Sequence, residues 1–344
     1  MARETGLSYD DVLLVPQRSP VDSRESVDLT TVLADGLEPS VPVLSAAMDT
    51  VTEAELARAV AEAGGLGVVH RFLTPDRQAA MVRSVADDDH PVAGAVGVAE
   101  SYVDRAAALV EAGTTMIVVD VAHGHMERVL EAAERLAERF PDTPLCAGNV
   151  VTRAAVADLA AVGVDCVKVG VGPGSHCTTR EVTGFGVPQF TAVERCAAAA
   201  DDHGVTVVAD GGVRASGDAV KALLAGADAV MMGGFFAGCE EAPGEVIEVD
   251  GERYKRSRGM STAAAAEDRE DKAVEVAADE GVEAVTEYAG PAGSRIEEFA
   301  AGIRSGLSYA GADDLETARQ NAEFMRVTPT TKRRNGAHGF ARTE

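Results

Sequence analysis

Eight short apolar runs, each followed by a stretch rich in Ala, Glu and Arg, restrict the fold more than any other feature of this sequence. The runs, which are typical of buried β-strands, cover residues 41–46, 65–70, 92–98, 115–121, 144–150, 166–172, 205–212 and 229–234. The intervening stretches have helical character, for example over residues 53–63, 126–140 and 216–225. Eight such units predict a closed parallel (β/α)8 barrel of the TIM type, with its active site at the carboxyl ends of the strands. A doubly wound open sheet remains the alternative, because the same alternation produces it.

The remaining segments are expected to complete one domain that spans residues 1–344. Two connections are too long for plain βα loops, namely residues 170–188 and 235–295, and such insertions often carry function. The second contains Asp250-Gly251 between alternating residues, which predicts a hairpin. We interpret residues 240–292 as an active-site flap after the eighth strand, with a mobile part over 262–284 where apolar periodicity is weak. Closing helices are expected over 296–310 and 315–324, and a loose tail over 330–344.

The charge balance excludes several classes of function. The chain has 56 Asp and Glu against 31 Lys and Arg, a net charge of −25, whereas nucleic-acid and anionic-membrane binders need a basic face. So acidic a surface indicates adaptation to a salt-rich cytosol. No apolar stretch approaches the roughly 20 residues of a membrane span, and the first residues do not form a signal segment, so we expect a cytoplasmic protein. The 5 cysteines lack metal-site spacing, which leaves buried thiols or one reactive thiol.

The loop after the sixth run carries the first chemical signal. It reads GVGPGSHCTTR over residues 170–180. Its glycines permit close backbone approach and its Ser175 adds a hydroxyl donor, which together can form an anion cradle. Cys177 follows on the same polar loop at the predicted catalytic face, where backbone donors and arginines favour a nucleophilic thiolate. On this evidence alone, a loop cysteine without a role is as good an interpretation.

Two further glycine turns follow the neighbouring strands. Gly211-Gly212 comes after the seventh run and Gly233-Gly234 after the eighth, the positions where barrels often bind phosphate through backbone N–H groups. They predict a phosphorylated ligand, since backbone dipoles do not depend on net charge. Asp210, between the seventh strand and its turn, is a candidate acceptor for ribose hydroxyls, although an aspartate that merely closes a turn would look the same.

Six motifs together resemble one known family. They are LSYDDVLL at 7–14, SAAMDTVT at 45–52, GNVVT at 148–152, the 170–180 loop, TGFGVPQ at 183–189 and RGMS at 258–261. This set is similar to the inosine monophosphate (IMP) dehydrogenase and guanosine monophosphate (GMP) reductase family, over residues 7 to about 329. The resemblance implies that Cys177 attacks C2 of a purine nucleotide held by its 5′-phosphate, while a nicotinamide cofactor exchanges hydride at that carbon.

The resemblance also implies roles for individual residues. Thr179 and Glu280 would handle the proton of the departing amino group, and Arg71 stands where the family has a lysine, so that it holds charge without shuttling a proton. The nucleotide would contact Met48, Ser175, Asp210, Gly212, Gly233, Gly234, Arg258, Gly259, Met260 and Ser261. The cofactor would contact Asp120, Ala122, Asn149 and Gly170, and a monovalent cation, potassium, would bind the carbonyls of Gly172, Gly174 and Cys177.

Three features favour the reductase branch of the family. Residues 70–92 leave no room for the regulatory cystathionine-β-synthase-type modules of most dehydrogenases, residues 255–287 lack the tyrosine of the Arg-Tyr pair that activates water, and the flap over 261–280 is short. The expected reaction is NADPH-dependent reductive deamination of GMP to IMP and ammonia, by a homotetramer. Two alternatives stay open. One is an NAD-dependent IMP dehydrogenase, because residues 280–283 resemble bacterial dehydrogenases, and the other is a catalytically silent nucleotide-binding relative.

Overall fold

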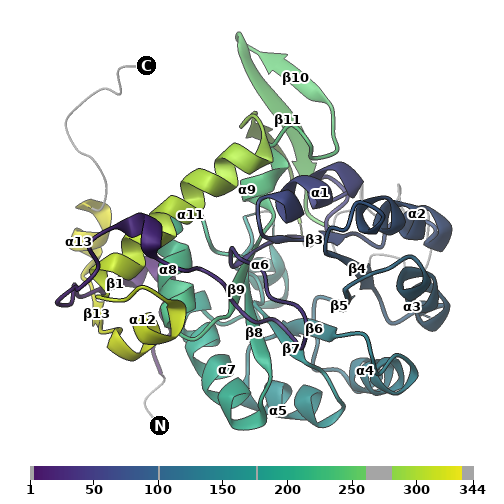
Figure 1. Cartoon of the computed structure of the whole chain (residues 1–344), viewed down its shortest axis with the longest axis horizontal. Helices are drawn as coiled ribbons and strands as arrows, with labels where there is room; N and C mark the ends of the chain where they lie inside the picture. The colour runs from purple at the N-terminus through teal and green to yellow at the C-terminus, as the bar shows by residue number, and fades with distance from the viewer. Residues whose placement is uncertain (1–3, 100, 176, 261–280, 335–344) are drawn as a thin grey trace.

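Eight parallel strands close into a barrel in the computed structural model, which describes residues 4–99, 101–175, 177–260 and 281–334. The strands are β2 (Val43–Ser45), β3 (Leu66–Val69), β4 (Val92–Val96), β5 (Met116–Asp120), β6 (Leu145–Val150), β7 (Cys166–Val169), β8 (Thr206–Asp210) and β9 (Ala229–Met232). The ring is closed by the pairing of β2 with β9, in which Leu44 lies opposite Met231. The predicted (β/α)8 barrel is therefore confirmed, and the open sheet is excluded (Figure 1).

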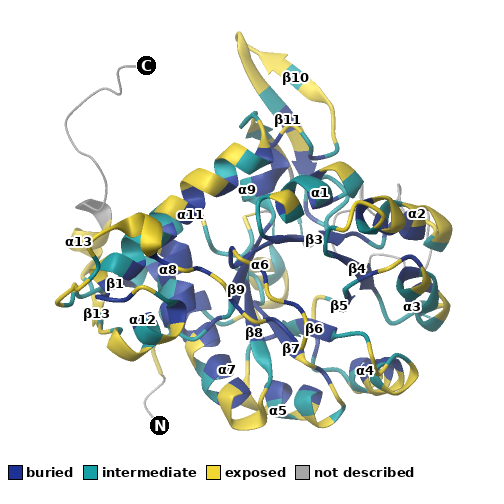
Figure 2. Cartoon of the chain, viewed as in Figure 1, coloured by how far each residue is buried: buried dark blue, intermediate teal, exposed yellow. Residues whose placement is uncertain are grey.

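Helices surround the barrel. They are α1 (Ala54–Glu62), α2 (Pro75–Ala86), α3 (Tyr102–Glu111), α4 (Glu127–Arg139), α5 (Arg153–Ala161), α7 (Gln189–His203), α8 (Ser216–Leu224) and α11 (Ala292–Tyr309), with the short α6 (Thr179–Thr183) and α9 (Gly234–Ala237) at the strand ends. In α4 the buried positions, among them Val129 and Leu136, recur at helical spacing, which turns one apolar face toward the barrel (Figure 2). None of the described helices is both long and apolar enough to cross a membrane.

Two apolar cores hold the scaffold together. One fills the barrel interior and includes Leu66, Val118 and Met231, and the other lies between the strands and the helices. Figure 2 shows the strands as a buried centre with exposed residues on the outer sides of the helices. The loops at the strand ends therefore rest on a rigid, close-packed base.

The two ends of the described chain pair with each other. After the turn η1 (Tyr9–Asp11), strand β1 (Val12–Leu14) pairs with β13 (Phe324–Arg326), while η2 (Arg24–Ser26) packs near α11. The prediction of a helix over 315–324 is wrong at its end, because α12 (Leu315–Asn321) stops early and Phe324 packs against Phe190 with ring centres 4.8 Å apart. The predicted loose tail also begins too early, since α13 (Pro329–Arg334) is helical; residues 335–344 lie outside the described part.

The flap contains a three-stranded antiparallel sheet. Its strands are β10 (Val246–Val249), β11 (Glu252–Arg258) and β12 (Glu283–Glu287), and the β10–β11 hairpin projects from the barrel in Figure 1. The predicted hairpin is confirmed: Val249 lies opposite Glu252, and both turn residues have positive φ, 54° at Asp250 and 86° at Gly251. The expectation of a mobile part up to residue 284 is wrong, because residues 283 and 284 pair with β11. Residues 261–280, with Ser261 and Glu280, lie outside the described part.

Candidate active site

A pocket of about 860 Å³ opens at the carboxyl ends of the strands. Its lining comes from the cysteine loop, both later glycine turns, the N-terminal turn η1 and the flap sheet. Of the expected nucleotide residues it includes Met48, Ser175, Asp210, Gly212, Gly233, Gly234, Gly259 and Met260, together with the expected nucleophile Cys177, whereas Arg258 is not in the described lining. The volume lies within the range of pockets for small molecules and cofactors.

The three glycine-containing segments meet at one wall of this pocket. A Cβ added at Gly211 would lie 3.0 Å from Pro173 Cγ and 3.2 Å from the Gly174 nitrogen, and one added at Gly234 would lie 3.1 Å from Ser175 Oγ. Gly211 and Gly212 have φ values of 86° and 79°, a left-handed conformation that glycine adopts without strain. Backbone N–H groups and the serine hydroxyl are thus gathered where a phosphate could bind.

Cys177 ends a tight turn that begins at Gly174, and its side chain lies beside Thr179. Its Sγ donates to Thr179 Oγ1 at 3.1 Å, and its backbone N–H donates to the Gly174 carbonyl at 3.2 Å. Cys177 also forms an antiparallel backbone bridge with Gly281, the residue that follows Glu280 in the chain. The half-buried thiol therefore faces a hydroxyl, and the flap strand returns to the barrel at the cysteine loop.

Carbonyl oxygens of this loop are candidates for the expected monovalent cation. Gly172 has φ of 78°, and a Cβ there would lie 2.5 Å from Arg180 Cγ. The Gly174 carbonyl accepts from Cys177 and keeps a second lone pair. Arg180 fastens the loop, since its Nε donates to the Val171 carbonyl at 3.2 Å and its Nη2 to the Val187 carbonyl at 2.8 Å. This donor set fits a potassium ion, which backbone carbonyls coordinate.

A buried lysine for which the sequence predicts no role connects the expected cofactor residues with the expected nucleotide residues. Lys168 lies in β7, is 3% exposed, and places its Nζ 3.0 Å from Asp120 Oδ1 and 2.6 Å from Asp210 Oδ2. Asp120, Gly148 and Lys168 occupy one row across β5, β6 and β7. Because a Cβ at Gly148 would lie 2.6 Å from Lys168 Cβ, the missing side chain lets the lysine reach Asp120.

Lys168 and Asp120 stabilise each other's charged forms, and Asp210 also stabilises that of Lys168. Burial by itself lowers the pKa of Lys168, but Asp120 and Asp210 raise it above the ordinary lysine value. Burial likewise raises the pKa of Asp120, but Lys168 and then Arg71 lower it below the ordinary aspartate value. Asn149 completes the network, since its Nδ2 donates to the Gly170 carbonyl at 2.7 Å and to Asp210 Oδ2 at 2.8 Å, and its Oδ1 accepts from Lys168.

The expected cofactor residues gather at the ends of β5, β6 and β7, outside the described lining of the pocket. Ala122 is exposed, whereas the side chains of Asp120 and Asn149 are tied to Lys168. Arg71 lies beside them, with its Nε 3.3 Å from the Asp120 carbonyl and its guanidinium 4.8 Å from the centre of the Phe72 ring. The exposed Ala122, beside these fixed polar groups, leaves space for a flat ring such as nicotinamide. The contacts of the cofactor with these residues remain a prediction.

A second ion pair connects the flap sheet to the barrel. Arg258 of β11 donates through Nε to Asp49 Oδ2 at 2.9 Å and through Nη2 to the same oxygen at 2.5 Å. The Asp49 N–H lies 3.3 Å from Met260 Sδ, and a Cβ at Gly233 would lie 2.7 Å from Met48 Sδ. Arg258 thus anchors the strand that carries Gly259 and Met260 into the pocket. Asp49, its partner, stands inside a recognised motif, yet no role for it was predicted.

Comparisons with known proteins agree with this geometry. Residues 6–338 match the family described as the IMP dehydrogenase / GMP reductase domain. The chain is 34% identical to the inosine-5′-monophosphate dehydrogenase of Nitrosopumilus maritimus, over 95% of this chain and 97% of that protein. It is also 34% identical to the enzyme of that name from Aquifex aeolicus, over 97% and 95%. A crystal structure of a GMP reductase variant from Trypanosoma brucei, in complex with guanosine 5′-monophosphate, superposes with a TM-score of 0.95 at 30% identity and covers 99% of both chains.

Proposed function

Since the chain belongs to the IMP dehydrogenase / GMP reductase family of oxidoreductases, we propose that it is a GMP reductase that converts GMP to IMP and ammonia with NADPH. The observation that carries this choice is the composition of the flap around the cysteine loop. Residues 255–287 contain no tyrosine, so the flap lacks the Arg-Tyr pair with which, by family resemblance, dehydrogenases activate water. The thiol instead faces Thr179, a group suited to passing a proton to a leaving amine.

The proposed chemistry begins at Cys177. Its thiolate forms a bond to C2 of the purine, and the bond from C2 to the exocyclic nitrogen breaks, leaving a thioimidate. Thr179, together with Glu280, delivers the proton with which the amino group leaves as ammonia. Bound NADPH supplies a hydride equivalent. When C2 has gained that hydride, the C–S bond breaks, IMP is released and the thiolate returns.

The nucleotide would be held by groups that take no part in bond making. Ser175 and the backbone of Gly212, Gly233 and Gly234 would bind the 5′-phosphate. Asp210, whose Oδ2 is fixed by Lys168 and Asn149, would accept from the ribose hydroxyls. The proposal includes a potassium ion on the carbonyls of Gly172, Gly174 and Cys177 and assembly as a homotetramer, and these two parts rest on family resemblance.

IMP dehydrogenase activity is the second candidate. The observation in its favour is that the curated relatives described above carry that name. That activity would require a water-activating group other than a flap tyrosine.

Ammonium release tests the proposal. We expect one ammonium ion and one IMP for each NADPH oxidised when GMP is supplied, because the amino group and the hydride exchange at the same carbon. Ammonium is measured enzymatically and IMP by chromatography. NADPH oxidation without ammonium, or no consumption of GMP at all, would contradict the reductase assignment.

Glu280→Gln is expected to lower the rate of ammonia release about a hundredfold or more, since general acid–base groups contribute about 10²–10⁴. The reverse hydride step, from IMP and NADP⁺ to the covalent intermediate, should stay within about threefold of the unmodified protein because it needs no proton on nitrogen. A burst of NADPH absorbance measures that step. Glu248→Gln, at an exposed position of the flap sheet, is the matched control. Equal loss of both steps would remove the assigned role.

A further inference from the structure

One arginine of the pocket has a buried side-chain donor without a hydrogen-bond partner among the described residues. Within the described residues, the buried side-chain atoms without a hydrogen-bond partner are Tyr9 OH, Asp49 Oδ1, His70 Nε2, Gln189 Oε1 and Arg295 Nε. Tyr9, Gln189 and Arg295 line the pocket. Of these three only Arg295 carries a permanent charge. A buried donor without a partner is costly unless a ligand satisfies it.

The position of Arg295 is set by its neighbours. It lies in the first turn of α11, and its guanidinium carbon is 4.4 Å from the centre of the Phe235 ring. Phe235 directly follows Gly233 and Gly234, the third glycine turn of the cradle. The first N–H group of α11 already has a partner, because Ala292 donates to Glu241 Oε2 at 2.9 Å. The arginine side chain therefore supplies a donor at this side of the pocket.

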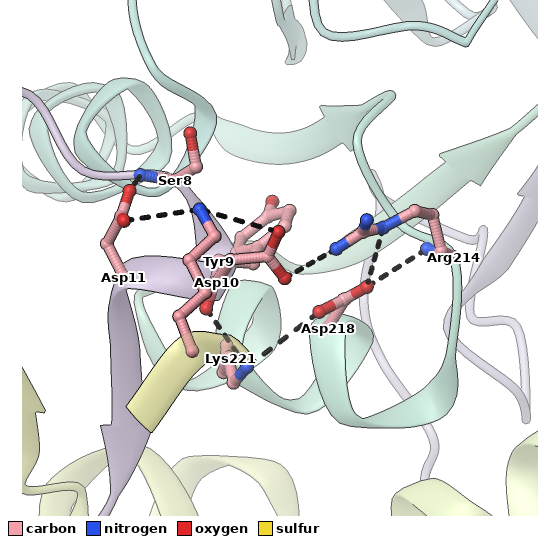
Figure 3. Close-up of polar contacts among 8 residues, drawn as sticks. Ser8, Tyr9, Asp10, Asp11, Arg214, Asp218 and Lys221 are labelled. Atoms are coloured by element: carbon pink, nitrogen blue, oxygen red, sulfur yellow. Dashed lines mark hydrogen bonds and ion pairs between the residues drawn. The ribbon is translucent and has the colours of Figure 1, made fainter. Parts of the chain in front are cut away.

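The two other arginines of the lining already have partners for their guanidinium groups. Arg180 donates to the Val171 and Val187 carbonyls. Arg214 lies between two carboxylates, with its Nη2 2.5 Å from Asp10 Oδ1 and its Nε 3.8 Å from Asp218 Oδ2 (Figure 3). Burial, and then Asp218, raise the pKa of the Tyr9 hydroxyl, so it stays neutral and supplies no positive charge. Arg258, which lies outside the described lining, is paired with Asp49. For Arg295, in contrast, no described carboxylate lies within ion-pair distance.

We propose that Arg295 binds the 5′-phosphate of the nucleotide together with Ser175 and determines the preference of this pocket for phosphorylated over unphosphorylated nucleosides. A guanidinium suits this task, since its planar fork matches two phosphate oxygens. The inference deepens the proposed function, and it rests on that function only for the statement that the ligand is a purine nucleoside monophosphate. It also explains how a chain with a net charge of −25 provides a full local positive charge for an anion.

The test compares equilibrium binding of GMP and guanosine without cofactor, by isothermal titration calorimetry in molar potassium chloride. Arg295→Met should raise the dissociation constant for GMP about tenfold or more, as expected for a charged hydrogen bond. Guanosine affinity should change less than about twofold, and Arg295→Lys should recover part of the GMP affinity. Arg139→Met is the matched control, since Arg139 lies over Phe140 at 5.3 Å at the end of α4, on another flank of the barrel.

The outcomes separate the inference from the proposed reaction. A change in GMP affinity below about twofold in Arg295→Met, or an equal loss for GMP and guanosine, overturns the role of Arg295. If the unmodified protein binds GMP with this dependence on Arg295 but does not turn it over, the proposed reaction fails and the inference stands. Thermal melts of all variants check that each is folded.

Discussion

Cys177→Ala is expected to lower NADPH-dependent turnover of GMP by at least about a thousandfold, since loss of a nucleophile removes the covalent route altogether. GMP affinity should stay within about twofold, because the phosphate and ribose groups are assigned to other residues. The thiol side chain is half-buried and its hydrogen bond is to Thr179 alone among the described groups, so its removal leaves no buried charge unpaired. Steady-state rates at 340 nm and equilibrium titration measure the two quantities.

Cys196→Ala is the control for loss of a thiol. Cys196 is buried in α7, away from the pocket, and burial raises its pKa to about 12, so it is not expected to react. That variant should keep its activity, and an iodoacetamide-type reagent should label Cys177 in it unless GMP is bound. Turnover retained by Cys177→Ala would contradict the covalent mechanism.

Lys168→Met is expected to lower the free energy of unfolding by about 3–5 kcal/mol, the usual result of leaving buried charges without their partner. The variant would remove the cation that now pairs with both Asp120 and Asp210. The preference for GMP over 2′-deoxyguanosine monophosphate should also shrink, because Asp210 loses the group that orients it. Lys168→Arg, which keeps the charge, should restore part of both properties.

The pH dependence identifies the electrostatic part of this loss. In the unmodified protein the pKa of Asp120 is lowered, so its stabilising effect is present above the ordinary aspartate pKa and is lost only as pH falls through the lowered value. The pKa of Lys168 is raised, so its effect is present below the ordinary lysine pKa and is lost as pH rises through the raised value. Between these limits the contribution is constant.

In Lys168→Met the burial of Asp120 acts without its main counter-charge and raises its pKa. The destabilisation should therefore be larger at pH 8 than at pH 5, where protonation of Asp120 relieves the uncompensated charge. Urea unfolding at both pH values and constant salt measures this difference. An equal loss of stability at pH 5 and pH 8 would show that Lys168 contributes through packing alone.

The barrel and the main features of the site could be predicted because local patterns encode them. Buried parallel strands have to be continuous apolar runs, and eight of them with helices between leave few ways to close a sheet. The Asp250-Gly251 turn and the glycines beside Ser175 require backbone angles that few other residues adopt, so they too can be recognised locally.

Other features depend on contacts between distant segments. Lys168 is a single charge within an apolar strand, and its partners become visible only when the register aligns it with Gly148 and Asp120. Strand β12 was missed because it contains two glutamates in five residues, and its pairing with β11 decides its structure. The end of the helix before Phe324 cannot be predicted locally, because the packing of Phe324 against Phe190, more than 100 positions earlier, leaves no local signal.

The central claim is the direction of the reaction, and absorbance at 340 nm tests it most directly. GMP with NADPH and IMP with NAD⁺ are compared in molar potassium chloride, which screens the net charge of −25. The account predicts a loss of absorbance in the first mixture and no change in the second. A rise in the second mixture alone, with xanthosine monophosphate formed, would contradict it and establish a dehydrogenase that activates water without a flap tyrosine.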